Sequence, residues 1–276
     1  LNIKTVKKSY NNKTVILTGG SGSIGRSIIK KLYEYNILNI DNNKPKRLLH
    51  NETFLKFDLN NYKDIPIFLD NNIKYKKKNI YGLINNAAIT IPNNILDYDI
   101  SDWEKTYNIN LFSAFILIKY FSKIMCSNKM KGSIVNITSI GAEKAFPNNP
   151  AYQSSKAALK HLTKSAAYDL SKFGIRVNSL APGYTESEMN IKSWKDRKQR
   201  NLRSKHILTL YLAFFLFFYN CNLCLQIGLF LFSSILKNPL IQNQKKEMNF
   251  YPYKTHSRHY LYHFSDEEEK LAEVNR

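Results

Sequence analysis

The chain has 276 residues, three cysteines and a formal net charge of +20, so it is long enough to bury a core but too poor in cysteine for a disulfide framework. We therefore expect a protein of a reducing compartment, the cytoplasm, without a signal peptide. The basic residues are scattered among many Asn and Tyr, as an AT-rich coding sequence explains, and no nucleic-acid motif accompanies them, so we expect no nucleic-acid partner.

The chain opens with a predicted strand at 13–18, a glycine-rich turn at 19–25 and a helix at 26–35. The turn reads GGSGSIG, and its glycines permit a tight turn and close packing of the helix. In such units the backbone N–H groups at the helix start, here near Ser23 and Ile24, face a pyrophosphate. The order of strand, turn and helix therefore predicts a phosphate-binding loop.

A second predicted strand, at 35–40, leads into Asp41, which stands about 20 residues after the glycine-rich turn. An acid at this point binds the hydroxyls of an adenosine ribose and favours NAD. The basic residues Lys44, Lys46 and Arg47 follow and would meet a 2′-phosphate. We therefore expect NAD as the cofactor, with NADP as the alternative.

Strands and helices alternate along the chain as far as about residue 180. This alternation predicts an α/β fold, a doubly wound parallel sheet of Rossmann type with its site at the carboxyl edge. Small residues, Asn86-Ala87-Ala88, follow the fourth strand and would let a cofactor lie against the backbone. The further predicted strands are 53–57, 80–84, 134–138 and 175–180, and the predicted helices are 64–71, 101–126 and 151–172.

Tyr152 and Lys156 stand four residues apart in the last of these helices, and Ser139 follows the preceding strand. The spacing places both side chains on one helical face. A free tyrosine has a pKa near ~10, and a neighbouring ammonium favours the phenolate, so we expect the pKa of Tyr152 to be lowered. Together the three side chains suit proton transfer at a carbonyl or an alcohol. A lone pair with this spacing is more often an ordinary surface Tyr and Lys, so this interpretation depends on the rest of the chain.

Over residues 13–203 the chain resembles the short-chain dehydrogenase/reductase family. The resemblance rests on TGGSGSIG, Asp41, Asp58, NNAA, NIN at 108–110, Ser139, the Tyr-Lys pair and PGYTESEM, in that order. Ser23 and Ala88 replace glycines that the family usually has. The resemblance implies an NAD(P)-dependent oxidoreductase that interconverts a secondary alcohol and a ketone by hydride transfer. A sugar, a polyol or a 3-oxoacyl thioester would be the substrate.

The resemblance also implies a role for each residue that matches the family's motifs. Tyr152 would be the general acid/base, and Ser139 would position and polarise the carbonyl. Lys156 would lower the tyrosine pKa and hold the nicotinamide ribose. Asn110 would hold a water in a proton relay to Lys156. A homodimer or homotetramer is expected by the same analogy, and no metal. The implied cofactor-binding residues are Thr18, Gly19, Ser21, Ser23, Ile24, Gly25, Asp41, Asp58, Leu59, Asn86, Ala87, Ala88, Tyr152, Lys156, Pro182, Gly183 and Ser187.

After about residue 206 the resemblance stops, and no glycine-rich final strand follows. We expect a Rossmann domain at 1–203 that lacks its final edge strand, and we assign no fold to 204–276. The apolar run at 207–236 has three interpretations: a membrane-spanning helix, an apolar lid or oligomer surface, and an out-of-frame sequence, which we favour. Cys221 and Cys224 lie in this run without a second pair of metal ligands.

The altered C-terminus leaves two alternatives to an active cytoplasmic enzyme. One is a catalytically impaired nucleotide-binding remnant of such an enzyme. The other is a membrane-tethered reductase, anchored through the apolar run. The complete set of Asn110, Ser139, Tyr152 and Lys156 favours the enzyme.

Overall fold

The computed structural model describes residues 12–73 and 79–183, which all belong to one compact unit, Leu1–Gln242. Five expectations concern residues outside these two ranges. They are the role of Ser187, the Cys221–Cys224 pair, the apolar run at 207–236, the domain boundary after 203 and the absence of a final edge strand.

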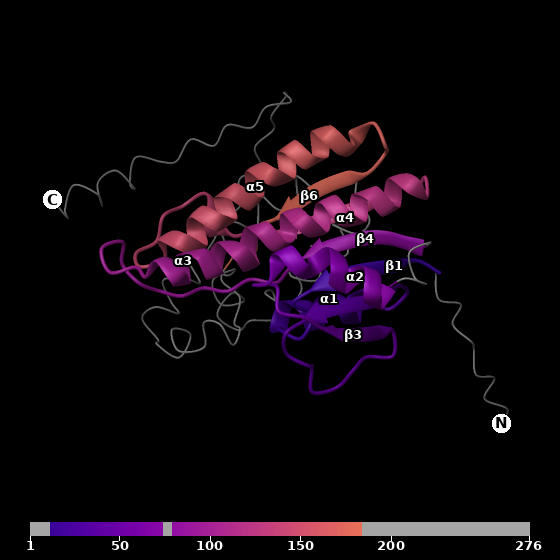
Figure 1. The fold of residues 1–276 in the computed structure, drawn as a ribbon, viewed down its shortest axis with the longest axis horizontal. Coiled ribbons are helices and arrows are strands. Elements are labelled where there is room, and N and C mark those ends of the chain that lie inside the picture. Colours follow the sequence, from indigo (N-terminus) through magenta and orange to yellow (C-terminus); the bar gives the residue numbers. More distant parts are fainter. Residues whose placement is uncertain (1–11, 74–78, 184–276) are drawn as a thin grey trace, which may run out of the picture. The chain divides into compact units, whose positions relative to one another are not determined.

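Six parallel strands form one sheet, and they are β1 (Thr14–Thr18), β2 (Asn36–Asp41), β3 (Glu52–Lys56), β4 (Ile80–Asn85), β5 (Ser133–Ile137) and β6 (Arg176–Leu180). Their order across the sheet is β3-β2-β1-β4-β5-β6 (Figure 1). The direction of strand addition reverses between β1 and β4. In open α/β sheets the crevice beyond the carboxyl ends of the strands at such a reversal binds ligands. The expected doubly wound α/β fold is therefore confirmed.

Helices cover both faces of the sheet. One face packs against α2 (Ile65–Ile73), α4 (Ser113–Ser127) and α5 (Pro150–Ser171), and the other packs against α1 (Ser23–Lys31). In Figure 1, α4 and α5 lie side by side along the sheet. The shorter helical segments are the 3₁₀ turn η1 (Tyr62–Asp64), α3 (Ile100–Tyr107), the π-helical turn η3 (Asn108–Phe112) and the 3₁₀ turn η4 (Ile140–Ala142).

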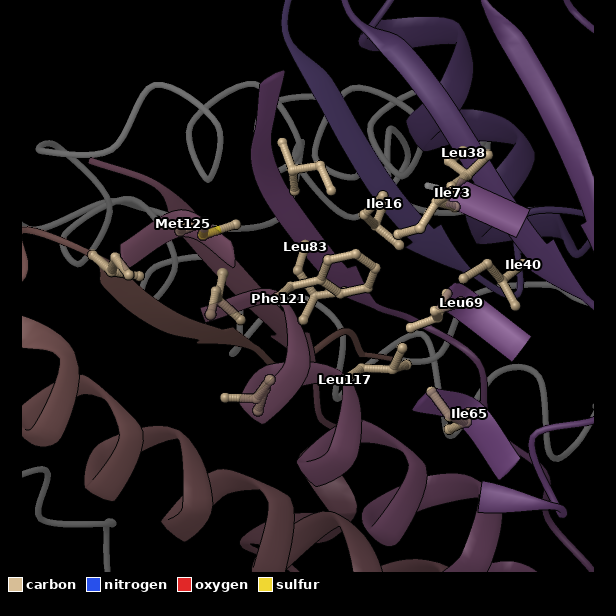
Figure 2. Close-up of a cluster of buried hydrophobic side chains, with 14 of the residues drawn as sticks. Ile16, Leu38, Ile40, Ile65, Leu69, Ile73, Leu83, Leu117, Phe121 and Met125 are labelled. Atoms are coloured by element: carbon tan, nitrogen blue, oxygen red, sulfur yellow. The ribbon is translucent and has the colours of Figure 1, made fainter. Parts of the chain in front are cut away.

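The central strands are buried along most of their length and mostly apolar, because both of their faces are covered. In β1, Val15 and Leu17 belong to the core beneath α1, whereas Ile16 belongs to the core on the opposite face. Figure 2 shows this second core, where Phe121 of α4 lies beside Leu83 and is completely buried. Alternation along each strand thus supplies both cores at once.

The helical run Ile100–Ser127, which includes α3, η3 and α4, is long and apolar enough by length and composition to cross a membrane, because an 18-residue window within it has a mean hydropathy of 1.4. Its Leu117, Phe121 and Met125 side chains are buried in the core at 0–1% exposure. Packing against the sheet therefore accounts for the apolar character of this run.

Two predicted helices differ from the structure. The first was expected at 26–35, but α1 ends at Lys31, and Asn51 Nδ2 donates to the carbonyls of Leu32 and Tyr35, both at 3.0 Å. Both carbonyls lie beyond the last residue of α1, and the Asn51 amide satisfies them there. The helix expected at 101–126 is interrupted by the π-helical turn η3. Asp41 is the last residue of β2 rather than the residue after it.

Candidate functional site

The carboxyl ends of β1 and β4 are joined by hydrogen bonds where the strand order reverses. Thr18 Oγ1 accepts the backbone N–H groups of Asn86 and Ala87, both at 3.0 Å. The Asn86 amide donates in return to the carbonyls of Thr18 and Gly19, at 3.0 and 2.9 Å. Gly19 has a φ of +67°, and a Cβ there would lie 2.8 Å from Ala87 Cα. The expected cofactor residues Thr18, Gly19, Asn86 and Ala87 therefore lie together, and the lack of a side chain at Gly19 lets the segment after β4 pack closely on it.

The glycine-rich turn brings the start of α1 against the end of β1. A Cβ on Gly25 would lie 2.2 Å from the carbonyl oxygen of Gly19 and 2.6 Å from Gly20 Cα, so the helix packs directly on the turn. Helix α1 begins at Ser23 after Gly22, which offers no capping side chain, and its first turn contains no acid. The first N–H groups of a helix have no partner within it, and the dipole there favours an anion. Ser23 and Ile24 therefore lie at a helix start that favours an anion.

The Asp41 carboxylate lies at the edge of this turn. It accepts the N–H of Ser21 at 3.0 Å through Oδ2 and the N–H of Asn43 at 3.0 Å through Oδ1. Lys44, Lys46 and Arg47 follow in an exposed connection. An acid that contacts the turn is therefore followed within six residues by three exposed bases.

The other expected cofactor residues also follow strand ends. Asp58 is two residues beyond β3, and its Oδ1 accepts the N–H of Asn60 at 2.9 Å. The Leu59 side chain is 6% exposed and belongs to the core, so this residue can present only its backbone to a ligand. Ala88 continues the segment after β4, and Pro182 and Gly183 follow β6.

Ser139, Tyr152 and Lys156 meet beyond the end of β5. Ser139 caps η4, where its Oγ accepts the N–H of Gly141 at 3.0 Å. Its side chain also lies near enough to the Tyr152 hydroxyl to lower the pKa of that group. Lys156 Nζ lies 5.9 Å from the centre of the Tyr152 ring and donates to the carbonyl of Ile137 at 2.7 Å. The three side chains that the sequence singled out are therefore brought together.

The pKa of Tyr152 differs from the expectation, and the pKa of Lys156 is shifted as well. Burial raises the pKa of Tyr152 above its ordinary value, and the hydrogen bond with Ser139 acts in the opposite direction but is smaller. Burial also lowers the pKa of Lys156 to about 7, because its ammonium is removed from water. The expected lowering of the tyrosine pKa by a lysine cation is therefore wrong for the site as it stands. The reason is that burial disfavours the charged forms of both groups, the tyrosinate and the ammonium.

The buried lysine makes stability depend on pH. The folded pKa of Lys156, about 7, lies below the ordinary value of 10.5, so the unfolded chain binds this proton more tightly. The resulting loss of stability is fully present below about pH 7 and disappears as the pH rises towards 10.5. We expect Lys156→Met to gain stability relative to the wild type, by an amount that shrinks over this range. Urea unfolding of both proteins across the range measures the difference, and a difference that is independent of pH would contradict the shift.

Asn110 lies in the π-helical turn and is 1% exposed. Its Nδ2 donates to the carbonyl of Ile89 at 3.0 Å and to Ser155 Oγ at 3.1 Å, and its Oδ1 accepts the N–H of Ile89 at 2.9 Å. The side chain therefore holds the segment after β4 against α5, beside Lys156. The π-helical turn had no signal in the sequence, since no proline or glycine occurs there.

Two further polar residues that the sequence reasoning missed hold loops around Tyr152. Gln153 accepts the N–H of Phe146 at 2.8 Å and donates to its carbonyl at 2.6 Å. Asn149 accepts a hydrogen bond from Thr90 Oγ1 at 2.8 Å. Both residues belong to the start of α5 or lie next to it, so they fix the loop before the helix and the segment after β4. The only signal in the sequence is their proximity to Tyr152.

Comparisons with known proteins find relatives over most of the chain. A family model described as short chain dehydrogenase matches residues 13–198. The 3-oxoacyl-[acyl-carrier-protein] reductase FabG of Rickettsia typhi is 34% identical over 199 residues, which cover 69% of this chain and 79% of that protein. The acetoacetyl-CoA reductase of Synechocystis sp. is 30% identical over 197 residues, which cover 68% of this chain and 78% of that protein.

Solved structures show the same fold. A 4-hydroxyisoleucine dehydrogenase complexed with NADH is 29% identical, with a TM-score of 0.65 over 69% of this chain and 81% of that one. ElxO with NADP bound is 28% identical, with a TM-score of 0.62 over 70% of this chain and 82% of that one. The dinucleotides in these structures agree with the nicotinamide cofactor expected from the sequence.

Proposed function

This chain belongs to the short-chain dehydrogenase family, and we propose that it is an oxidoreductase that interconverts a secondary alcohol and a ketone with a nicotinamide dinucleotide. One observation carries this proposal. Ser139 lies beyond the end of β5, the neighbour of β4, and acts on the Tyr152 hydroxyl, while Lys156 lies one helical turn along α5. This arrangement supports a proton donor next to a dinucleotide site at the ends of β1 and β4.

The residues around the strand reversal fit a dinucleotide. The start of α1 offers backbone N–H groups without a capping side chain, and hydrogen bonds hold the ends of β1 and β4 together beside it. Bound there, the cofactor would supply or accept the hydride. Asp41 would bind the adenosine ribose and Asp58 the adenine. Asn86 to Ala88 would line the adenosine side, and Pro182, Gly183 and Ser187 would line the nicotinamide end.

The chain's own residues would handle the proton. The raised pKa of Tyr152 keeps its hydroxyl protonated at neutral pH, so in the direction of ketone reduction it can donate this proton to the carbonyl oxygen. The Ser139 hydroxyl would bind the same oxygen and hold it in line with the tyrosine. Lys156 would return a proton to the tyrosinate, and a water held by Asn110 would relay a proton to Lys156. The bonds of the Asn110 side chain place it beside Ser155, the neighbour of Lys156.

We propose a 3-oxoacyl thioester as the first substrate to test, because FabG and the acetoacetyl-CoA reductase are both named for such substrates. The test is NADH oxidation by the full chain with a 3-oxoacyl thioester, a keto sugar and a simple ketone offered in parallel. Turnover with one of them is the expected result. Saturable NADH binding without turnover on any ketone would favour a nucleotide-binding protein that has lost catalysis.

By the resemblance alone we also propose a cytoplasmic homo-oligomer that pairs through α4 and α5. Phe115 of α4 and Tyr168 of α5 are 45% and 84% exposed, so both helices present aromatic surface. Sedimentation of the purified chain should give the mass of a dimer or a tetramer. A single monomeric species at micromolar concentration would contradict this proposal.

A further inference from the structure

A buried network of polar side chains is hydrogen-bonded to the glycine-rich turn through Asn39. Asn39 stands in the middle of β2 and is 0% exposed, among Ile37, Leu38 and Ile40. Its Oδ1 accepts the N–H of Gly20 at 2.9 Å, and its Nδ2 donates to Glu52 Oε1 at 2.8 Å. A buried amide is costly unless it is hydrogen-bonded, so both bonds matter to the folded chain.

Glu52 connects this asparagine to α1. The Glu52 side chain is 0% exposed, and Arg26 Nη1 lies 2.7 Å from each of its carboxylate oxygens. Glu52 Oε2 also accepts the N–H of Leu49 at 3.0 Å, and Arg26 Nη2 donates to the carbonyl of Arg47 at 3.0 Å. The buried carboxylate therefore has both a cationic partner and further donors, as a buried charge requires.

The turn rests directly on Asn39. A Cβ on Gly20 would lie 2.3 Å from Asn39 Oδ1, so the two residues are in close contact. The next N–H group of the turn, on Ser21, is bound by Asp41 of the same strand. Two successive peptide groups of the turn are therefore held by side chains of β2, at alternate positions along it.

We propose that Asn39, held by Glu52 and Arg26, is a positioning residue for dinucleotide binding. It fixes the glycine-rich turn so that the N–H groups at the start of α1 and the Asp41 carboxylate reach the pyrophosphate and the ribose of the same molecule. The inference rests on the proposed cofactor site. It adds three residues, Arg26, Asn39 and Glu52, none of which would touch the cofactor.

The test compares Asn39→Ala with Asn51→Ala in the full-length protein. Asn51 is 7% exposed and donates two hydrogen bonds to backbone carbonyls, but its bonds go to Leu32 and Tyr35, away from the turn. Both substitutions remove a buried amide, so both are expected to lower stability in urea unfolding. Only Asn39→Ala is expected to weaken NADH binding, by about tenfold or more, in a titration that follows nicotinamide fluorescence.

The outcomes separate this inference from the function on which it rests. Asn39→Ala should keep kcat within about threefold at saturating NADH, since it does not touch the reacting atoms. Equal changes of NADH affinity in the two variants, or none in Asn39→Ala, would overturn the positioning role alone. A wild-type chain that binds neither NADH nor NADPH would overturn the proposed function and this inference together. If Asn39→Ala does not fold, Glu52→Gln replaces it. Both Glu52 carboxylate oxygens accept hydrogen bonds, so the NH₂ group of a glutamine would face a donor and would weaken the bonding that holds Asn39.

Discussion

Replacing Tyr152 by phenylalanine is expected to lower kcat by on the order of 10²–10⁴-fold, because the substitution removes the group that would give its proton to the substrate oxygen. The ring remains, so the packing at the start of α5 is kept. NADH affinity is expected to change by less than about threefold, since the hydroxyl would act mainly in the transition state. Steady-state turnover and an NADH titration on the same preparation measure the two effects separately.

The matched control is Tyr168→Phe on the same helix. Tyr168 is 84% exposed, so losing its hydroxyl should leave both turnover and NADH affinity as in the wild type. Near-normal turnover of Tyr152→Phe would remove Tyr152 from the mechanism. Equal losses of turnover in Tyr152→Phe and Tyr168→Phe would mean that any substitution in α5 lowers activity, so the effect would not be specific to the proton donor.

Adding one methyl group at Gly25 is expected to weaken NADH binding by on the order of 10–100-fold. The new Cβ would lie 2.2 Å from the Gly19 carbonyl oxygen and 2.6 Å from Gly20 Cα, and both are backbone atoms that cannot rotate away. The start of α1 must therefore move away from the turn that it contacts. An NADH titration of Gly25→Ala, with urea unfolding in parallel, measures the effect on binding and on stability.

Gly22→Ala provides the comparison within the same turn. A Cβ on Gly22 would lie 3.7 Å from its nearest neighbour, the Gly19 carbonyl oxygen, which is an ordinary contact. Its φ of −76° is also accessible to alanine. Gly22→Ala should therefore bind NADH within about threefold of the wild type. If the two alanine variants lose affinity equally, close packing at Gly25 is not what shapes the turn.

Much of the fold could be predicted because its signals are local. The strands of the sheet are short runs rich in β-branched and apolar residues, and Gly174, with a φ of +70°, follows the end of α5 as the sequence indicates. The Ser139, Tyr152 and Lys156 positions follow from one strand end and one helical turn. These signals are properties of neighbouring residues, which the sequence shows directly.

The features that could not be predicted depend on distant residues. The Asn39 network joins β2, β3 and α1, so its members stand 13 to 26 positions apart and have no common motif. The raised pKa of Tyr152 comes from burial, which the spacing of Tyr152 and Lys156 does not report. The π-helical turn at Asn110 is stabilised by bonds to Ile89 and Ser155, on two other segments.

The most direct test of the central claim is a titration of the purified full-length chain with NADH and with NADPH, followed by nicotinamide fluorescence. We expect saturable binding of both or of one, with NADH preferred because Asp41 occupies the ribose end of the turn. Tighter binding of NADPH would mean that Lys44, Lys46 and Arg47 bind the 2′-phosphate of its adenosine ribose and outweigh Asp41. Failure of a folded chain to bind either dinucleotide would contradict the claim that the ends of β1 and β4 form a nicotinamide cofactor site.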